Sequence, residues 1–187
     1  MRRFAAFALL LIPGAALAAA APPPGLAELL AATAGDWQGE LQYRDYQSNK
    51  WEGLPVKVKV TAQGDGVTVV RTAAFDDGPK TGTVYITTVT QLDPATGRES
   101  YAAFRKNREP DSGAVQLSLG SGPRDLTHWT IIATETRKDG DSLAAVRETT
   151  TRNGTSLVTL KEVDPVDDGV TGWQPRNRTV LELAGKP

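Results

Sequence analysis

The sequence predicts an all-β protein, a closed or nearly closed antiparallel up-and-down β-barrel of about 8–10 strands with a short N-terminal helix. Apolar and polar residues alternate in one segment after another, turn residues separate these segments closely, and no crossover helix follows the first helical run. Short connections force neighbouring strands to be antiparallel. Closure of the sheet removes the two edges that an open meander would expose, so a two-sheet sandwich is the second choice.

The amino-acid composition excludes several classes of function. The chain has 187 residues, of which 21 are basic and 22 acidic, and its net charge is -1. This balance gives no electrostatic footprint for nucleic acid, so no nucleic-acid partner is expected. Cysteine is absent, which excludes thiolate catalysis, disulfides, cysteine metal sites and a cysteine-anchored lipid tail.

Residues 1–20 are predicted to be a signal peptide. Arg2 and Arg3 form a positive n-region, residues 4–12 a short apolar region, and Ala16-Leu17-Ala18 a signal-peptidase pattern. General secretion is favoured over twin-arginine export, because the arginine pair directly follows the initiator. The apolar run is too short for a permanent anchor, so the mature chain is expected to have no membrane span. We expect a periplasmic or secreted protein, cleaved near Ala18–Ala21.

Residues 21–34 are predicted to form a spacer and a short helix. Pro22 to Pro24 are stiff and extended, and the Ala/Leu-rich run from Leu26 to Ala34 ends at Gly35, a helix stop. Its apolar face is wide enough to plug one end of a larger core. Residues 35–187 then form a single barrel domain.

The strand signals follow in order. In the first, Trp37, Leu41 and Tyr43 share one side, and in the second Leu54, Val56, Val58 and Val60 alternate with lysines and a threonine. Asn153-Gly154 is a strong hairpin signal. The remaining strands are expected at 67–75, 83–92, 99–106, 115–119, 126–137, 143–152, 156–163 and 176–183.

The short helix, the Gly35-Asp36-Trp37 stretch and the antiparallel meander resemble the calycin superfamily, which includes lipocalins and fatty-acid-binding proteins. The resemblance implies that Trp37 packs across the barrel floor and that a late arginine, Arg178 or less favourably Arg176, lies over its ring. Gly35, Trp37 and Arg178 are therefore expected to form a structural barrel floor. The strand count and Gly39 are more similar to the fatty-acid-binding and nitrobindin-like branches.

The sequence also departs from these families. Nitrobindin-like barrels hold haem through a histidine near the C-terminal end, whereas the single histidine here, His128, lies well upstream. Haem is not carried over, and no cofactor is expected. The lipocalin Thr-Asp-Tyr motif is missing, since Arg44-Asp45-Tyr46 stands in the wrong place for it.

Motifs for catalysis or metal binding are weak. Alternation places His128 opposite Trp129, on the outer face, with no triad or metal partners beside it. The Asp76-Asp77 and Asp167-Asp168 loops lack the ligand pattern of a calcium site and are typical turns. We predict no metal site and no catalytic residues.

Three arginines are in phase with apolar residues. Arg137 shares a side with Trp129, Arg147 with Leu143, and Arg105 with Tyr101. Because buried charges are costly unless paired, these arginines either ring a wet barrel mouth or receive an anionic group of a ligand. The wet rim is favoured, since the charges cluster at strand ends.

The sequence thus predicts an exported barrel that binds a small, mostly apolar ligand in its interior. The expected ligand-binding residues are Tyr43, Val58, Tyr101, Trp129 and Arg147. Alternatives are a non-catalytic cell-envelope interaction module with a packed interior, and an isomerase or lyase using a carboxylate such as Glu135. An outer-membrane barrel ranks last, because charged residues face outward. Ligand identity and oligomeric state stay open.

Overall fold

The computed structural model describes residues 22–45, 47–139, 142–166, 169–170 and 172–185. The predicted signal peptide lies outside this part of the chain. Within it the main elements are a short N-terminal helix, α1 (Leu26–Ala31), and ten strands. The strands are β1 (Gly35–Asp45), β2 (Lys50–Ala62), β3 (Thr68–Asp76), β4 (Thr83–Asp93), β5 (Arg98–Arg105), β6 (Asp111–Asp125), β7 (His128–Asp139), β8 (Ser142–Asn153), β9 (Ser156–Pro165) and β10 (Gln174–Leu183).

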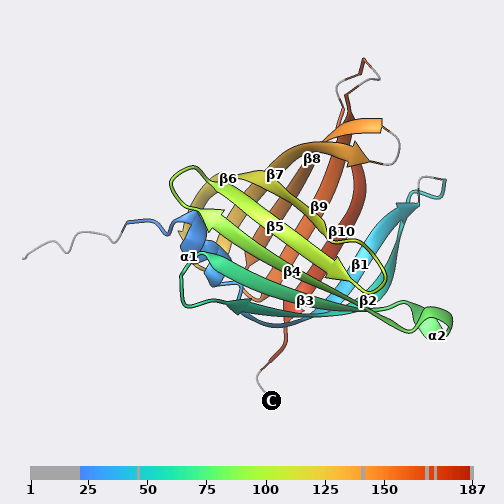
Figure 1. Ribbon diagram of the computed structural model, residues 1–187, viewed down its shortest axis with the longest axis horizontal. Coiled ribbons are helices and arrows are strands. Elements are labelled where there is room, and N and C mark those ends of the chain that lie inside the picture. The colour runs from blue at the N-terminus through green and yellow to red at the C-terminus, as the bar shows by residue number, and fades with distance from the viewer. Residues whose placement is uncertain (1–21, 46, 140–141, 167–168, 171, 186–187) are drawn as a thin grey trace, which may run out of the picture.

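The ten strands form a closed antiparallel barrel. Each strand pairs with its neighbours in the chain, and β1 pairs with β10 to close the ring (Figure 1). The closing register runs from Trp37 opposite Leu183 to Tyr43 opposite Asn177. This confirms the up-and-down barrel that the sequence predicts and excludes the two-sheet sandwich.

Alternation determines which side chains point into the barrel. On β2, Val56, Val58 and Val60 are buried, while Lys57 and Lys59 between them are exposed. Register carries this inner face to the neighbouring strands, because residues directly opposite each other lie on the same face of a sheet. Val58 thus lies opposite Trp37 on β1.

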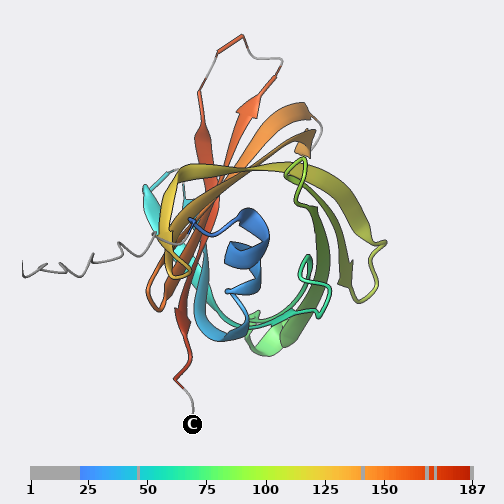
Figure 2. The ribbon, with the colours of Figure 1, turned by 90° about the vertical axis from the view of Figure 1, so that its left-hand side faces the viewer.

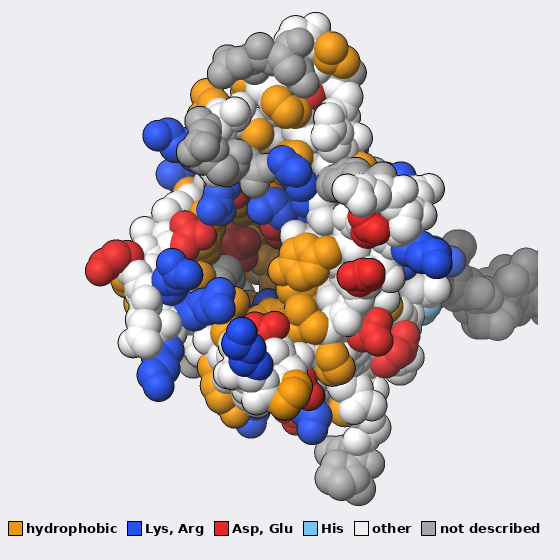
Figure 3. Space-filling view, turned by 90° about the vertical axis from the view of Figure 1, so that its right-hand side faces the viewer, with side chains coloured by type: hydrophobic (Ala, Val, Ile, Leu, Met, Phe, Trp, Pro, Cys, Tyr) orange, Lys and Arg blue, Asp and Glu red, His pale blue; other side chains and the backbone are white. Residues whose placement is uncertain are grey.

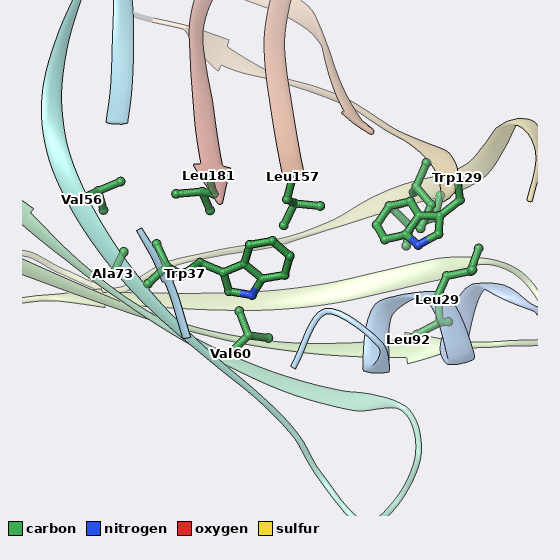
Figure 4. Close-up of a cluster of buried hydrophobic side chains, with 12 residues drawn as sticks. Leu29, Trp37, Val56, Val60, Ala73, Leu92, Trp129, Leu157 and Leu181 are labelled. Atoms are coloured by element: carbon green, nitrogen blue, oxygen red, sulfur yellow. The ribbon is translucent and has the colours of Figure 1, made fainter. Parts of the chain in front are cut away.

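α1 lies within one end of the ring of strands and closes it (Figure 2). Leu29 of the helix and Trp37 of β1 are almost fully buried, at 0% and 2% exposure. They belong to a cluster of apolar side chains at this end of the barrel (Figure 4). The Trp37 indole nitrogen donates a hydrogen bond to the Thr33 carbonyl at 2.9 Å, which ties the segment after the helix to the barrel. The hydrophobic core is therefore concentrated at the α1 end.

Two connections differ from the sequence prediction. The expected break around Asp76 contains a four-residue helix, α2 (Gly78–Thr81). Residues 120–125, predicted to be a turn, belong to β6, because two register shifts against β7 let the strand continue through them. Among the described residues, no helix has the length and apolar character that a membrane-crossing helix needs.

Candidate functional site

The interior of the barrel contains a cavity of about 400 Å³. Leu30 and Thr33 contribute to its lining from the helix end, and most of its wall comes from aliphatic and threonine side chains of the strands. The end of the barrel opposite α1 is visibly hollowed, with basic side chains around the rim (Figure 3). The volume lies in the range of small-molecule sites, which run from about 300 to 1,000 Å³.

The first polar group, called the outer polar group, consists of the cavity-lining residues Tyr101, Glu135 and Arg137 together with Asp111, an exposed residue that pairs with Arg137. Arg137 donates hydrogen bonds to the Tyr101 hydroxyl at 3.2 Å, to Glu135 at 3.4 Å and to Asp111 at 3.2 Å. Burial raises the pKa of Tyr101, and the charge of Glu135 raises it further. The outer polar group therefore satisfies its own charges.

A second set is the inner polar group, which consists of Arg71, Glu99 and Glu148, all of which line the cavity. Glu99 precedes Tyr101 by two residues on β5, on the side of the α1 end. Arg71 lies opposite the core residue Val60, and Glu148 opposite Ala133. Burial lowers the pKa of Arg71, while the charge of Glu148 raises it. By register these three residues lie nearer the α1 end than the outer polar group; Arg71 and Glu99 are half-buried, whereas Glu148 is exposed.

Glu99 and Glu148 both line the cavity, and the charge of Glu148 acts on the Glu99 carboxyl group. Burial raises the pKa of Glu99; a hydrogen bond from Thr90 opposes this shift, and the charge of Glu148 adds to it. Two carboxylates in one cavity disfavour simultaneous ionisation. Glu99 therefore keeps its proton to a higher pH than an exposed glutamate.

The barrel floor contains a different arginine from the predicted one. The Arg152 guanidinium lies 5.5 Å from the centroid of the Trp37 ring, and Arg152 is only 7% exposed. It donates hydrogen bonds to the carbonyls of Ala32 and Gly154. Arg178 instead lies 4.4 Å from the centroid of Trp51 and donates to Gln42 at 2.6 Å.

The expectation that Arg178 covers Trp37 is therefore wrong. Arg178 lies opposite Gln42 on β1, one residue out of phase with the inward positions of β10. Gly35 and Trp37 do lie at the α1 end, where Gly35 pairs with Val60.

Two of the five predicted ligand-binding residues, Val58 and Tyr101, line the cavity. Trp129 points inward but is packed in the core cluster with 4% exposure, and its indole donates to the Leu126 carbonyl at 3.0 Å. Tyr43 is 49% exposed and lines a separate, shallower pocket that also includes Arg105. The structure therefore brings only part of the predicted set together.

The predicted inward orientation of Arg147 is wrong. The buried apolar residues of β8 are Ala144 and Val146, in the same phase as the buried Arg152, so that Arg147 faces outward. There it forms an ion pair with Glu162 at 2.8 Å and lies 4.2 Å from the centroid of the Trp173 ring. Alternation could not assign the inner face of this strand because residues 143–146 are apolar in both phases. In the structure Val146 is buried, so its phase faces inward and that of Arg147 faces outward.

His128 lies on the outer face, as alternation predicts, with its Nδ1 atom 2.9 Å from Asp125. In the part of the chain that the structure describes, no cluster of three or more histidine, aspartate or glutamate side chains is arranged to hold a metal ion.

None of the three residues of the inner polar group was predicted as a site residue from the sequence. Arg71 lies in a strand whose two faces both carry apolar residues, so its side could not be assigned. Glu148 follows the same ambiguous run as Arg147. The pairing register of β2 and β3 was the signal that could have identified Arg71, because Arg71 lies opposite the inward-facing Val60.

Comparison with known proteins supports the architecture. No family model matches the chain, and neither does any curated protein. Among solved structures it is similar to the crystal structure of Rv2717c from M. tuberculosis, with a TM-score of 0.55 and 13% sequence identity. The match covers 86% of this chain and 99% of that one. The chain is thus an antiparallel ten-strand up-and-down barrel that shares its fold with a solved bacterial protein.

Proposed function

We propose that this protein binds a small, largely apolar molecule inside its barrel. The observation that carries the proposal is the cavity of about 400 Å³, in which apolar walls surround a few polar groups. Ligand sites typically combine a mostly apolar lining with a small number of placed polar side chains. Val58 and Tyr101 belong to this lining, so they are the predicted binding residues that the proposal retains.

The proposal also includes a relationship to the calycin superfamily. The resemblance implies a tryptophan at the closed end with an arginine from late in the chain over its ring; Trp37 has an arginine over it, although this is Arg152 of β8 and not a residue of the last strand. We also propose that the protein is exported before it folds, which the leader pattern of residues 1–20 supports. Expression of the full chain in a bacterium tests it, since the mature protein should be periplasmic or secreted and should begin near Ala21.

The two alternative functions receive less support. A packed interior, as expected for a pure interaction module, disagrees with the cavity. Glu135, the carboxylate considered for an isomerase or lyase, is held by Arg137 at 3.4 Å and faces the Tyr101 hydroxyl at 3.5 Å. These contacts occupy the carboxylate, whereas a general base must be free to reach the substrate proton.

A pair of neighbouring alanines on β5 provides the test. Ala103 lines the cavity, while Ala102 belongs to the outer face of the same strand. The neutral apolar dye N-phenyl-1-naphthylamine should bind the unaltered protein saturably, with an increase in fluorescence. Ala103→Trp fills the cavity and should weaken this binding at least about tenfold, since losing the burial of two or more methylene-sized groups costs about 1.5 kcal/mol.

Ala102→Trp is the matched control and should leave the affinity unchanged. Equal binding by both variants would place the dye on the outside of the barrel. An unaltered protein that does not bind the dye saturably would contradict the proposed function.

A further inference from the structure

The inner polar group holds opposite charges that do not meet. Within the described part of the chain, Arg71 takes part in no ion pair and no side-chain hydrogen bond, although its guanidinium lines the cavity. Glu148, on the other side of the barrel, is the acidic group whose charge acts on it. The outer polar group, in contrast, is joined by direct hydrogen bonds.

Such a separation leaves the half-buried Arg71 guanidinium without a close partner of opposite charge among the residues that the structure describes. Charges in a low-dielectric site lose hydration and are stabilised only by close partners. A fixed cation and a fixed anion on opposite walls also create a directed electric field between them, which stabilises a dipole aligned along it. A ligand group inserted between the walls would satisfy both charges at once.

We propose that the inner polar group binds the zwitterionic head group of a small amphiphile, with the anionic part on Arg71 and the ammonium part on Glu148. This inference rests on the proposed function, because the apolar tail would occupy the cavity already described. A guanidinium presents several donors in a planar fork that suits a carboxylate or phosphate. The Glu148 carboxylate offers the matching negative charge to a quaternary or protonated amine.

Singly charged head groups fit less well. A carboxylate on Arg71 would add a third acidic group to a site that already contains Glu99 and Glu148. An ammonium group beside Glu148 would leave the Arg71 charge without a partner and would add a second cation to the site. A head group that carries both charges instead gives Arg71 and Glu148, on opposite walls of the cavity, each a partner of opposite sign.

A matched series of decyl amphiphiles tests the head group with one tail. Isothermal titration calorimetry would compare the betaine decyl dimethylglycine, decanoate and decyltrimethylammonium, each below its micellar concentration at neutral pH. The betaine should bind the unaltered protein about tenfold more tightly than either singly charged compound, since one additional charged hydrogen bond is worth about 1.5–3 kcal/mol.

Substitution should separate the two halves of the site. Arg71→Gln should weaken the betaine and decanoate about tenfold and leave decyltrimethylammonium unchanged, whereas Glu148→Gln should weaken the betaine and decyltrimethylammonium and leave decanoate unchanged. Arg147→Gln, which alters an outward arginine on the same strand as Glu148, is the control and should change none of the affinities. Circular dichroism at the titration temperature verifies that each variant is folded.

The ranking in the unaltered protein decides the inference even if a variant does not fold. Equal binding of the three compounds, or tightest binding of decanoate or decyltrimethylammonium, would overturn the zwitterion assignment while leaving interior binding intact. Binding of the neutral dye without binding of any decyl compound would also overturn it. If neither the dye nor any decyl compound binds, the proposed function itself is wrong.

Discussion

Closure of the barrel between β1 and β10 depends on Gly39. A methyl group at Gly39 would lie 1.9 Å from the Val180 carbonyl oxygen and 3.0 Å from the Leu181 Cα atom. Both are backbone atoms of β10, so no side-chain rotation relieves the contact. To regain ordinary van der Waals separation, the two strands must move apart by about 1.5 Å, which also breaks the hydrogen bonds between them at this point.

The cost of Gly39→Ala follows from these two effects. Overpacking in a well-packed region costs about 1–3 kcal/mol, and each lost hydrogen bond about 1 kcal/mol. We therefore expect Gly39→Ala to lower the free energy of unfolding by about 3 kcal/mol. Urea unfolding followed by tryptophan fluorescence measures this change.

Two other glycines serve as matched controls. At Gly53 on β2 the nearest atom to an added methyl is the Glu40 carboxylate oxygen, at 2.7 Å, and this side chain can rotate away. At Gly122 on β6 nothing lies within 4 Å. Both substitutions to alanine should change the stability by less than about 1 kcal/mol. The described closure of the barrel would be refuted if Gly39→Ala were no more destabilising than Gly53→Ala.

Three further predictions concern charged side chains. Arg152→Ala removes the cation from the Trp37 ring and leaves two carbonyls without their donor, so it should lower the free energy of unfolding by about 2–4 kcal/mol. Arg178→Ala on the outer face should lower it by less than about 1 kcal/mol. Equal costs of the two substitutions in urea unfolding would contradict the placement of Arg152 at the barrel floor. Arg147→Ala breaks an outward ion pair and should cost at most about 1 kcal/mol while leaving dye affinity unchanged; loss of dye binding would place this arginine inside the barrel. Burial raises the pKa of Glu99, so its folded form holds the proton more tightly and its ionisation costs stability as the pH rises through the folded pKa. Glu99→Gln should therefore raise the Tm at neutral pH, with a gain that shrinks towards pH 4, and a gain that grows on acidification would contradict the sign of this shift.

The sequence was sufficient for the architecture because two signals agreed on the strands with clear alternation. Alternation on strands such as β2 assigned the inner face without ambiguity, since Val56, Val58 and Val60 alternate with lysines. Short turns then required antiparallel neighbours. Trp37 could be placed at one end because a large aromatic side chain at the start of a strand is best buried.

The site was harder to predict because it depends on contacts across the barrel. Arg152 and Trp37 are far apart in the chain, and no local pattern distinguishes Arg152 from Arg178 as the floor arginine. The inner polar group likewise combines β3, β5 and β8, which are not adjacent in one hairpin. Runs that are apolar in both phases, as before Arg147, leave the orientation to packing.

Valine methyl groups on the two faces of the barrel allow the most direct test of interior binding. The inward set of valines lines the cavity and consists of Val58, Val60, Val69, Val115 and Val146. The outward set alternates with inward residues and consists of Val70, Val89, Val158 and Val180. Titration of valine-labelled protein with N-phenyl-1-naphthylamine, followed by methyl NMR, should shift the inward set and leave the outward set unchanged. Saturable binding that shifts only the outward valines would contradict a ligand site inside the barrel.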